Sequence, residues 1–222
     1  MSELDQIIPP EISNDDLYLA IQRIAAETPL RHILEIGSSA GGGSTEAFVK
    51  GIMQNPSQPK LHCMEISGSR FEALQTRYAD TPNVCCLRAS SVGFEQFPAE
   101  KEVELFYRFV PTALNNYPLE MVLGWLRQDI AYLQKHDIQQ HGIRLIRERY
   151  GIDSFDMVLI DGSEFLGKAE LDEVYGAGII LLDDINGFKN YHNYQRLAQD
   201  PHYFNALENH TLRNGFAVFI RR

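Results

Sequence analysis

Carboxylates follow two short apolar runs of this 222-residue chain in a pattern that suits cation binding or proton transfer. Asp161 ends the run at 155–160, Glu164 comes three residues later, and the pair Asp183 and Asp184 ends the run at 178–182. Because ligands bind beyond the carboxyl ends of parallel strands, we expect these acids to share one rim. A divalent ion such as Mg²⁺ would offset their repulsion and lower the pKa of a substrate hydroxyl. The metal-free alternative leaves Asp161 to orient a cofactor and the pair to cap the next helix.

The segment at 188–194 places further donors and aromatic rings on the same rim. His192 is a candidate for proton transfer because the ordinary pKa of histidine lies near neutrality. Glu164 is a second candidate, and Lys189 is a candidate substrate contact. The alternative for His192 is an exposed residue at a helix start.

A glycine-rich turn at 37–43 joins an apolar run at 31–36 to a helical pattern. Glycines let the backbone approach a ligand, and the helix N-terminus favours an anionic group. The spacing lacks the G-x-G-x-x-G of dinucleotide-binding turns, which disfavours a nicotinamide cofactor. Glu65 ends the next apolar run, where nucleoside-binding folds hold two ribose hydroxyls, so it is the predicted ribose ligand.

The turn resembles the first motif, E-x-G-x-x-x-G, of the class I S-adenosylmethionine-dependent methyltransferases, with Glu35, Gly37 and Gly41 in that frame. The resemblance implies that Glu35 accepts from the cofactor's ammonium. It also implies that loop amides, including that of Ser38, and the hydroxyls of the helix start meet the cofactor's carboxylate. The remaining cofactor contacts it implies are the Ser44 hydroxyl, Ser91 beside the adenine, and Asp161.

The segment 155–188 resembles small-molecule O-methyltransferases of the macrocin type and, more distantly, catechol O-methyltransferase. It carries F-D-x-V-x-I-D-G and then D-D at the next strand end. By this resemblance Asp161, Asp183 and Asp184 are the metal ligands. Those families commonly place an acid or a histidine soon after Asp-Gly, whereas Ser163 and then Glu164 stand here, which leaves the general base open. The resemblance covers 31–87 and 155–222.

The alternation of apolar runs and helical patterns predicts one α/β domain over 1–222 with a Rossmann-like, mostly parallel seven-stranded sheet. Predicted helices cover 15–26, 44–53 and 69–78. Asn214-Gly215, between apolar runs at 206–211 and 216–220, predicts a type I′ turn and a C-terminal antiparallel hairpin strand. Residues 92–153 form a helical, lid-like insertion between the third and fourth strands. Trp125, Asp129 and Tyr132 share one face of this insertion. This face could line a substrate pocket, or it could serve ordinary packing and solvent contact.

Composition narrows the class of function. Twenty Lys and Arg against 30 Asp and Glu give a net charge of −10, which disfavours a nucleic-acid partner. No apolar stretch is long enough to span a membrane. The three cysteines lie in apolar runs without the spacing of a disulfide framework or a zinc site, so we expect them to be reduced core residues. We therefore expect a cytoplasmic protein without a membrane partner. The expected activity is S-adenosylmethionine-dependent O-methylation of a small-molecule or sugar-like hydroxyl. The alternatives are a catalytically silent cofactor-binding regulator and a nicotinamide-dependent oxidoreductase; the oligomeric state is open, a homodimer included.

Overall fold

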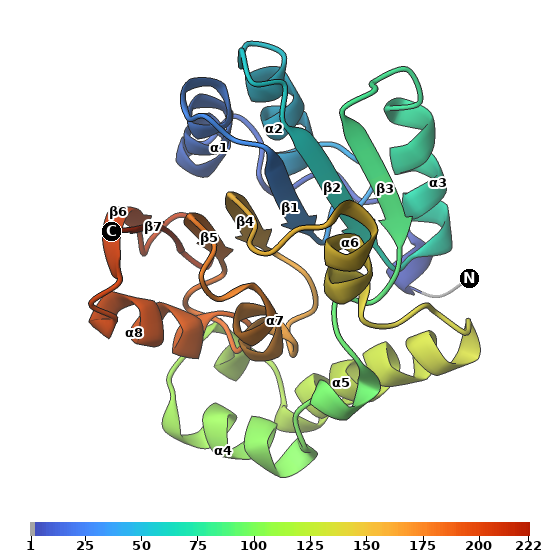
Figure 1. Ribbon diagram of the computed structural model, residues 1–222. Helices are drawn as coiled ribbons and strands as arrows, with labels where there is room; N and C mark the ends of the chain where they lie inside the picture. Colours follow the sequence, from blue (N-terminus) through green and yellow to red (C-terminus); the bar gives the residue numbers. More distant parts are fainter. Residues whose placement is uncertain (1–2) are drawn as a thin grey trace.

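The computed structural model describes residues 3–222, and this part of the chain contains one seven-stranded sheet. The strands are β1 (His32–Ile36), β2 (Lys60–Glu65), β3 (Val84–Arg88), β4 (Met157–Ile160), β5 (Ile179–Asp183), β6 (Tyr203–Asn209) and β7 (Phe216–Arg221). Their order is β3-β2-β1-β4-β5-β7-β6, and β1 to β5 are parallel (Figure 1). Only β7 runs antiparallel to its neighbours β5 and β6, so the predicted mixed sheet is confirmed.

Helices cover both faces of the sheet because its central strands are apolar on both sides. Ile33 of β1 packs with α1, α2 and α3, whereas the next residue, Leu34, packs with α6, α7 and α8. Figure 1 shows these two layers on opposite sides of the sheet. The α-helices are α1 (Asp16–Glu27), α2 (Ser44–Ile52), α3 (Gly68–Arg77), α4 (Glu100–Phe109), α5 (Leu119–Lys135), α6 (Gly142–Tyr150), α7 (Gly167–Val174) and α8 (Tyr191–Gln199).

The predicted insertion at 92–153 divides into two parts. Its last helix, α6, buries Ile143 and Ile146 against the sheet and is the crossover helix that leads to β4. Helices α4 and α5 form a small core of their own around Phe106 and Leu126. In Figure 1 they lie beyond the end of the sheet toward which the arrowheads of β1, β2 and β3 point. Within the insertion, α4 and α5 are therefore the part that lies outside the sheet and its covering helices.

The C-terminal hairpin differs from the predicted one. Asn209 already pairs with Phe216, so residues 210–215 form the connection in place of a two-residue Asn-Gly turn. The side chain of Asn209 accepts from the backbone N–H groups of Thr211 and Leu212, at 2.9 and 3.0 Å. This local turn ends β6 early and leaves Arg213 in a left-handed conformation at φ 51°.

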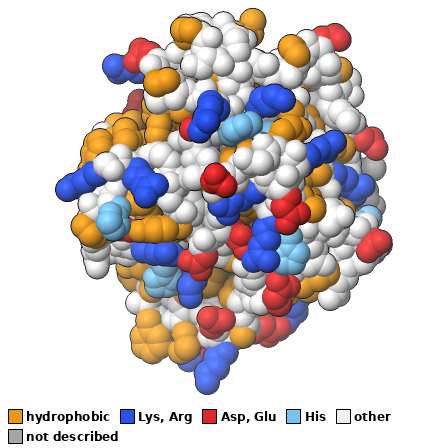
Figure 2. All heavy atoms as spheres, in the orientation of Figure 1, with side chains coloured by type: hydrophobic (Ala, Val, Ile, Leu, Met, Phe, Trp, Pro, Cys, Tyr) orange, Lys and Arg blue, Asp and Glu red, His pale blue; other side chains and the backbone are white. Residues whose placement is uncertain are grey.

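The charged surface, the helices and the cysteines were each the subject of a prediction from composition. Figure 2 shows basic and acidic side chains interspersed on one face of the molecule, so this face has no continuous basic area. Within residues 3–222, no helix combines the length and the apolar character needed to cross a bilayer. Cys63 is buried, and Cys85 and Cys86 are half-buried, all three as free thiols.

Candidate functional site

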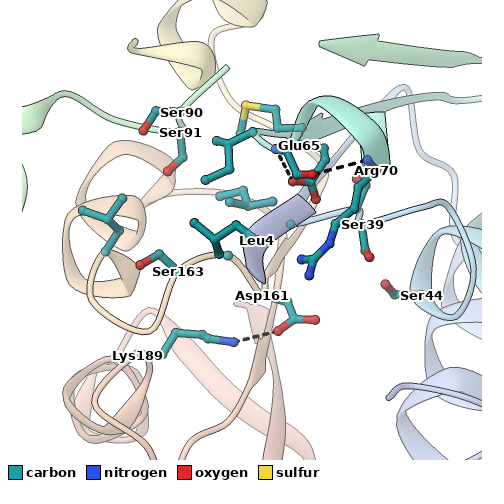
Figure 3. A pocket seen from close by; sticks show the side chains of 18 of the residues that line it. Leu4, Ser39, Ser44, Glu65, Arg70, Ser90, Ser91, Asp161, Ser163 and Lys189 are labelled. Atoms are coloured by element: carbon teal, nitrogen blue, oxygen red, sulfur yellow. Dashed lines mark hydrogen bonds and ion pairs between the residues drawn. The ribbon is translucent and has the colours of Figure 1, made fainter. Parts of the chain in front are cut away.

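A cavity of about 320 Å³ lies at the carboxyl ends of the parallel strands. The loop after β1, the end of β2, the loop after β3 and the loop after β4 all contribute to its walls. Figure 3 shows Glu65 on one side of this pocket and Asp161 with Lys189 on the other. Parallel strands bring these segments to one edge, although Gly37, Glu65, Ser91 and Asp161 follow one another in the sequence at separations of 28, 26 and 70 residues.

The loop after β1 must begin with a glycine. Gly37 has φ 89°, and a Cβ atom there would lie 2.1 Å from the carbonyl oxygen of Asp161. A glycine is required here because the neighbouring loop leaves no room for a side chain. The prediction from the sequence had explained the glycine by the close approach of a ligand. Gly41 does not line the cavity: a Cβ atom there would meet the side chains of Tyr78 and Leu74.

Glu35 is directed into the loop and does not reach the cavity. It is fully buried and accepts hydrogen bonds from the hydroxyls of Ser38 and Thr45, both at 2.7 Å. Burial raises the pKa of Glu35, and these two hydroxyls lower it in part. In this arrangement the acid shapes the turn, in contrast to the predicted contact with a cofactor ammonium. Ser38 and Ser44, two of the predicted cofactor contacts, line the cavity.

Glu65 lies where a ribose ligand would be expected. Its side chain lines the cavity and is 7% exposed. One carboxylate oxygen accepts from the backbone N–H of Ser67 at 2.7 Å, which fixes the side chain at the start of α3. Burial raises the pKa of Glu65, so a ligand that donates hydrogen bonds to this carboxylate would replace lost hydration.

Ser91, the predicted adenine contact, lines the cavity, but its hydroxyl already donates to another residue of the chain. It donates to Glu170 of α7 at 2.6 Å. Glu170 is fully buried, its second carboxylate oxygen has no partner among the described residues, and burial raises its pKa to about 7. No sequence pattern indicated this wall residue, because a single acid within a helix is typical of a solvent-exposed position.

Part of the insertion and the N-terminal segment close the cavity. Asp129 of α5 lines it and accepts from the Ser163 hydroxyl at 2.6 Å. Tyr132 donates to Asp5 at 2.7 Å and so binds the N-terminal segment. Residues 8–12 of that segment line the cavity, which no sequence pattern had indicated. Trp125 packs against Tyr117 outside it.

The three predicted metal ligands converge. Asp161, Asp183 and Asp184 each offer an oxygen within 4.8 Å of the others. Asp183 ends β5 and Asp184 has φ 57°, so the chain has left strand geometry between them, as a shared site requires.

A lysine of the chain lies within this cluster. Lys189 Nζ is 2.8 Å from Asp161 Oδ1 and 2.7 Å from Asp184 Oδ2. Arg213 pairs with Asp183 at 2.8 Å. Burial lowers the pKa of Lys189 and the carboxylates of Asp161 and Asp184 raise it, with a net upward direction that keeps the side chain an ammonium. The donor set suits a divalent ion in type, but two of its oxygens already bind this ammonium.

Glu164 and His192 lie outside the cavity lining. Glu164 accepts from the backbone N–H of Phe188 at 2.7 Å and so holds the loop before α8; burial raises its pKa to about 6. His192 packs edge-on against Phe106 at 5.6 Å between ring centroids, and burial lowers its pKa. Of the three predicted catalytic residues, only Lys189 lines the cavity.

Comparison with solved structures identifies the same fold in methyltransferases. An O-methyltransferase from Bacillus cereus in complex with S-adenosylhomocysteine matches with a TM-score of 0.55 at 14% identity, over 96% of this chain and 84% of that one. TomG, an O-methyltransferase of tomaymycin synthesis from Streptomyces achromogenes, matches with a TM-score of 0.55 at 16% identity, over 96% and 82%. A methyltransferase from Geobacter sulfurreducens matches with a TM-score of 0.54 at 9% identity, over 95% and 80%. No family model matches the sequence, and no curated protein does.

Proposed function

We propose that this protein is an S-adenosylmethionine-dependent methyltransferase that acts on a hydroxyl oxygen of a small molecule. The observation that carries the proposal is the buried carboxylate of Glu65 at the end of β2, which faces a cavity bordered by a glycine turn and a helix N-terminus. A carboxylate in this place accepts from two ribose hydroxyls, and the N-terminus of α2 suits the carboxylate of the cofactor's methionine end. The structural neighbours support this assignment, since they share the fold and several bind S-adenosylmethionine or its product.

The remaining walls suit the acceptor. Methyl transfer is an in-line displacement in which the positive charge on sulfur disappears, so a closed pocket and strict alignment favour it. Helix α5 contributes Asp129 and Leu133 to the cover, and the N-terminal segment contributes residues 8–12. A volume of about 320 Å³ falls in the range of small-molecule sites.

Two more specific assignments, the macrocin-type subfamily and assistance by Mg²⁺, are supported only by sequence motifs and side chains of this chain. The macrocin-type layout rests on the F-D-x-V-x-I-D-G and D-D motifs. Assistance by Mg²⁺ would use Asp161, Asp183 and Asp184, where the ion would polarise the acceptor oxygen. For this second assignment the ammonium of Lys189 is the competing cation.

Calorimetry with S-adenosylhomocysteine tests the cofactor site. We expect Glu65→Gln to weaken binding by about 1.5 to 3 kcal/mol, because the neutral amide removes the charge from the hydrogen bonds to the ribose. Glutamine keeps an acceptor for the Ser67 N–H, so the melting temperature should change little. The control is Glu72→Gln on the exposed face of α3. Equal affinity of Glu65→Gln and the unaltered protein would contradict the ribose assignment.

Transfer of a labelled methyl group from S-adenosylmethionine to a panel of hydroxyl-bearing metabolites tests the reaction. Labelled ether products would support the proposal. Tight S-adenosylhomocysteine binding without transfer to any acceptor would favour the regulatory alternative, and binding of a nicotinamide dinucleotide in its place would favour the oxidoreductase.

A further inference from the structure

We infer that Lys189 is the resident cation of the acceptor half of the site: its ammonium holds the place between Asp161 and Asp184 that a divalent ion would take, and it binds the acceptor oxygen directly. Methyl transfer here is then independent of a metal. This inference rests on the proposed methyltransferase function and specifies its acceptor site.

Charge balance is the first argument. Three carboxylates within 4.8 Å of one another repel strongly unless cations lie among them. The chain supplies two cations, with Lys189 on Asp161 and Asp184 and Arg213 on Asp183. Mg²⁺ binds oxygen at about 2.0 to 2.1 Å. An ion that bridged the same two oxygens would overlap the ammonium, so one of the two cations excludes the other.

The position of Lys189 is fixed by its surroundings. Its side chain is 6% exposed, and its carbonyl lies against Gly167, where a Cβ atom would be 2.0 Å away. The side-chain Nδ2 of the next residue, Asn190, donates to the backbone carbonyls of Ile160 and Asp183 at 3.0 and 2.6 Å. The backbone that carries the lysine is therefore bound to the ends of both β4 and β5. Such support holds the loop that carries the lysine and so restricts where the ammonium can lie.

One N–H of the ammonium is available to a substrate. An ammonium carries three donors. Two of them are used by Asp161 and Asp184, and no other described residue accepts the third. Lys189 lines the cavity together with both aspartates, and Figure 3 shows it reaching toward Asp161 on the side opposite Glu65. The third donor is therefore suited to an acceptor oxygen.

The reaction balances without a metal. The acceptor hydroxyl oxygen accepts from Lys189 and attacks the methyl carbon, which forms the new C–O bond. The C–S bond breaks, its electron pair stays on sulfur, and the sulfonium becomes a neutral thioether. The hydroxyl proton passes to the carboxylate of Asp184, which lines the cavity beside Lys189. The ammonium stabilises the negative charge that develops on oxygen during proton removal.

Titration with MnCl₂ tests the place of the ammonium without reference to activity. We expect no one-to-one binding of Mn²⁺ to the unaltered protein by calorimetry or electron paramagnetic resonance. Lys189→Met vacates the place between the carboxylates, so we expect it to bind one Mn²⁺, at least ten-fold more tightly than any residual binding by the unaltered protein. Lys168→Met, an exposed lysine of α7, is the matched control and should behave like the unaltered protein.

One-to-one binding of Mn²⁺ by the unaltered protein would overturn the inference, as would a folded Lys189→Met protein that binds it no better. If Lys189→Met does not fold, the titration of the unaltered protein decides alone. Methyl transfer by the unaltered protein should continue in EDTA, and its loss there with recovery on adding Mg²⁺ would also overturn the inference. A different result would contradict the proposed methyltransferase function itself, namely the absence of S-adenosylhomocysteine binding in calorimetry.

Discussion

Glu170→Gln should make the protein more stable at neutral and alkaline pH, because it removes a buried acid. Burial raises the pKa of Glu170 from the ordinary 4.5 to about 7, against smaller opposing effects of the Ser91 hydroxyl and Lys189. The folded protein therefore holds this proton more tightly than the unfolded chain. Its stabilising effect is present below pH 4.5 and is lost as the pH rises through about 7. At about 1.4 kcal/mol for each pKa unit, the full loss is about 3 kcal/mol.

Urea denaturation of both proteins between about pH 5 and about pH 8 measures this loss. Glutamine still offers Ser91 a carbonyl acceptor but never ionises, so its stability should lack this component of the pH dependence. We expect the free energy of unfolding of Glu170→Gln to rise relative to the unaltered protein by about 2 to 3 kcal/mol across that range. The exposed Glu72→Gln should show no such trend. A difference that stays constant with pH would refute the assignment of Glu170 as a buried carboxylate with a raised pKa.

Three other substitutions test the walls of the cavity. Gly37→Ala should cost more than about 2 kcal/mol in urea denaturation and abolish S-adenosylhomocysteine binding, because the added Cβ meets the Asp161 carbonyl; unchanged stability would contradict the loop geometry. Ser163→Ala should cost about 1 to 3 kcal/mol, since it leaves a buried carboxylate of α5 without its donor, and a neutral result in the same assay would show that the bond is absent. Tyr132→Phe should accelerate amide hydrogen exchange in residues 3–12, and exchange at the original rate would mean that the tyrosine hydroxyl does not hold this segment.

The fold was predictable because its signals are local. Continuous apolar runs such as 155–160 can be buried only between two helical layers, and their alternation with helices implies parallel strands. The carboxyl end of each run then fixes the edge where Glu65, Asp161 and Asp183 must lie. The hairpin was predicted less well, because the hydrogen bonds of the Asn209 side chain compete with the Asn-Gly turn preference.

The sequence by itself determined the sheet and the edge that carries the acids, whereas the structure showed that the oxygens of Asp161, Asp183 and Asp184 converge. Only the tertiary structure decided which side chains face the cavity. Glu35 accepts from Ser38 and Thr45 within its own loop, and Glu164 accepts from the Phe188 N–H, so neither lines the cavity. Lys189 reaches the acidic cluster from a loop held against β4 and β5. The physical reason is range: strand periodicity is set by adjacent residues, whereas the direction of a loop side chain depends on partners far away in the sequence.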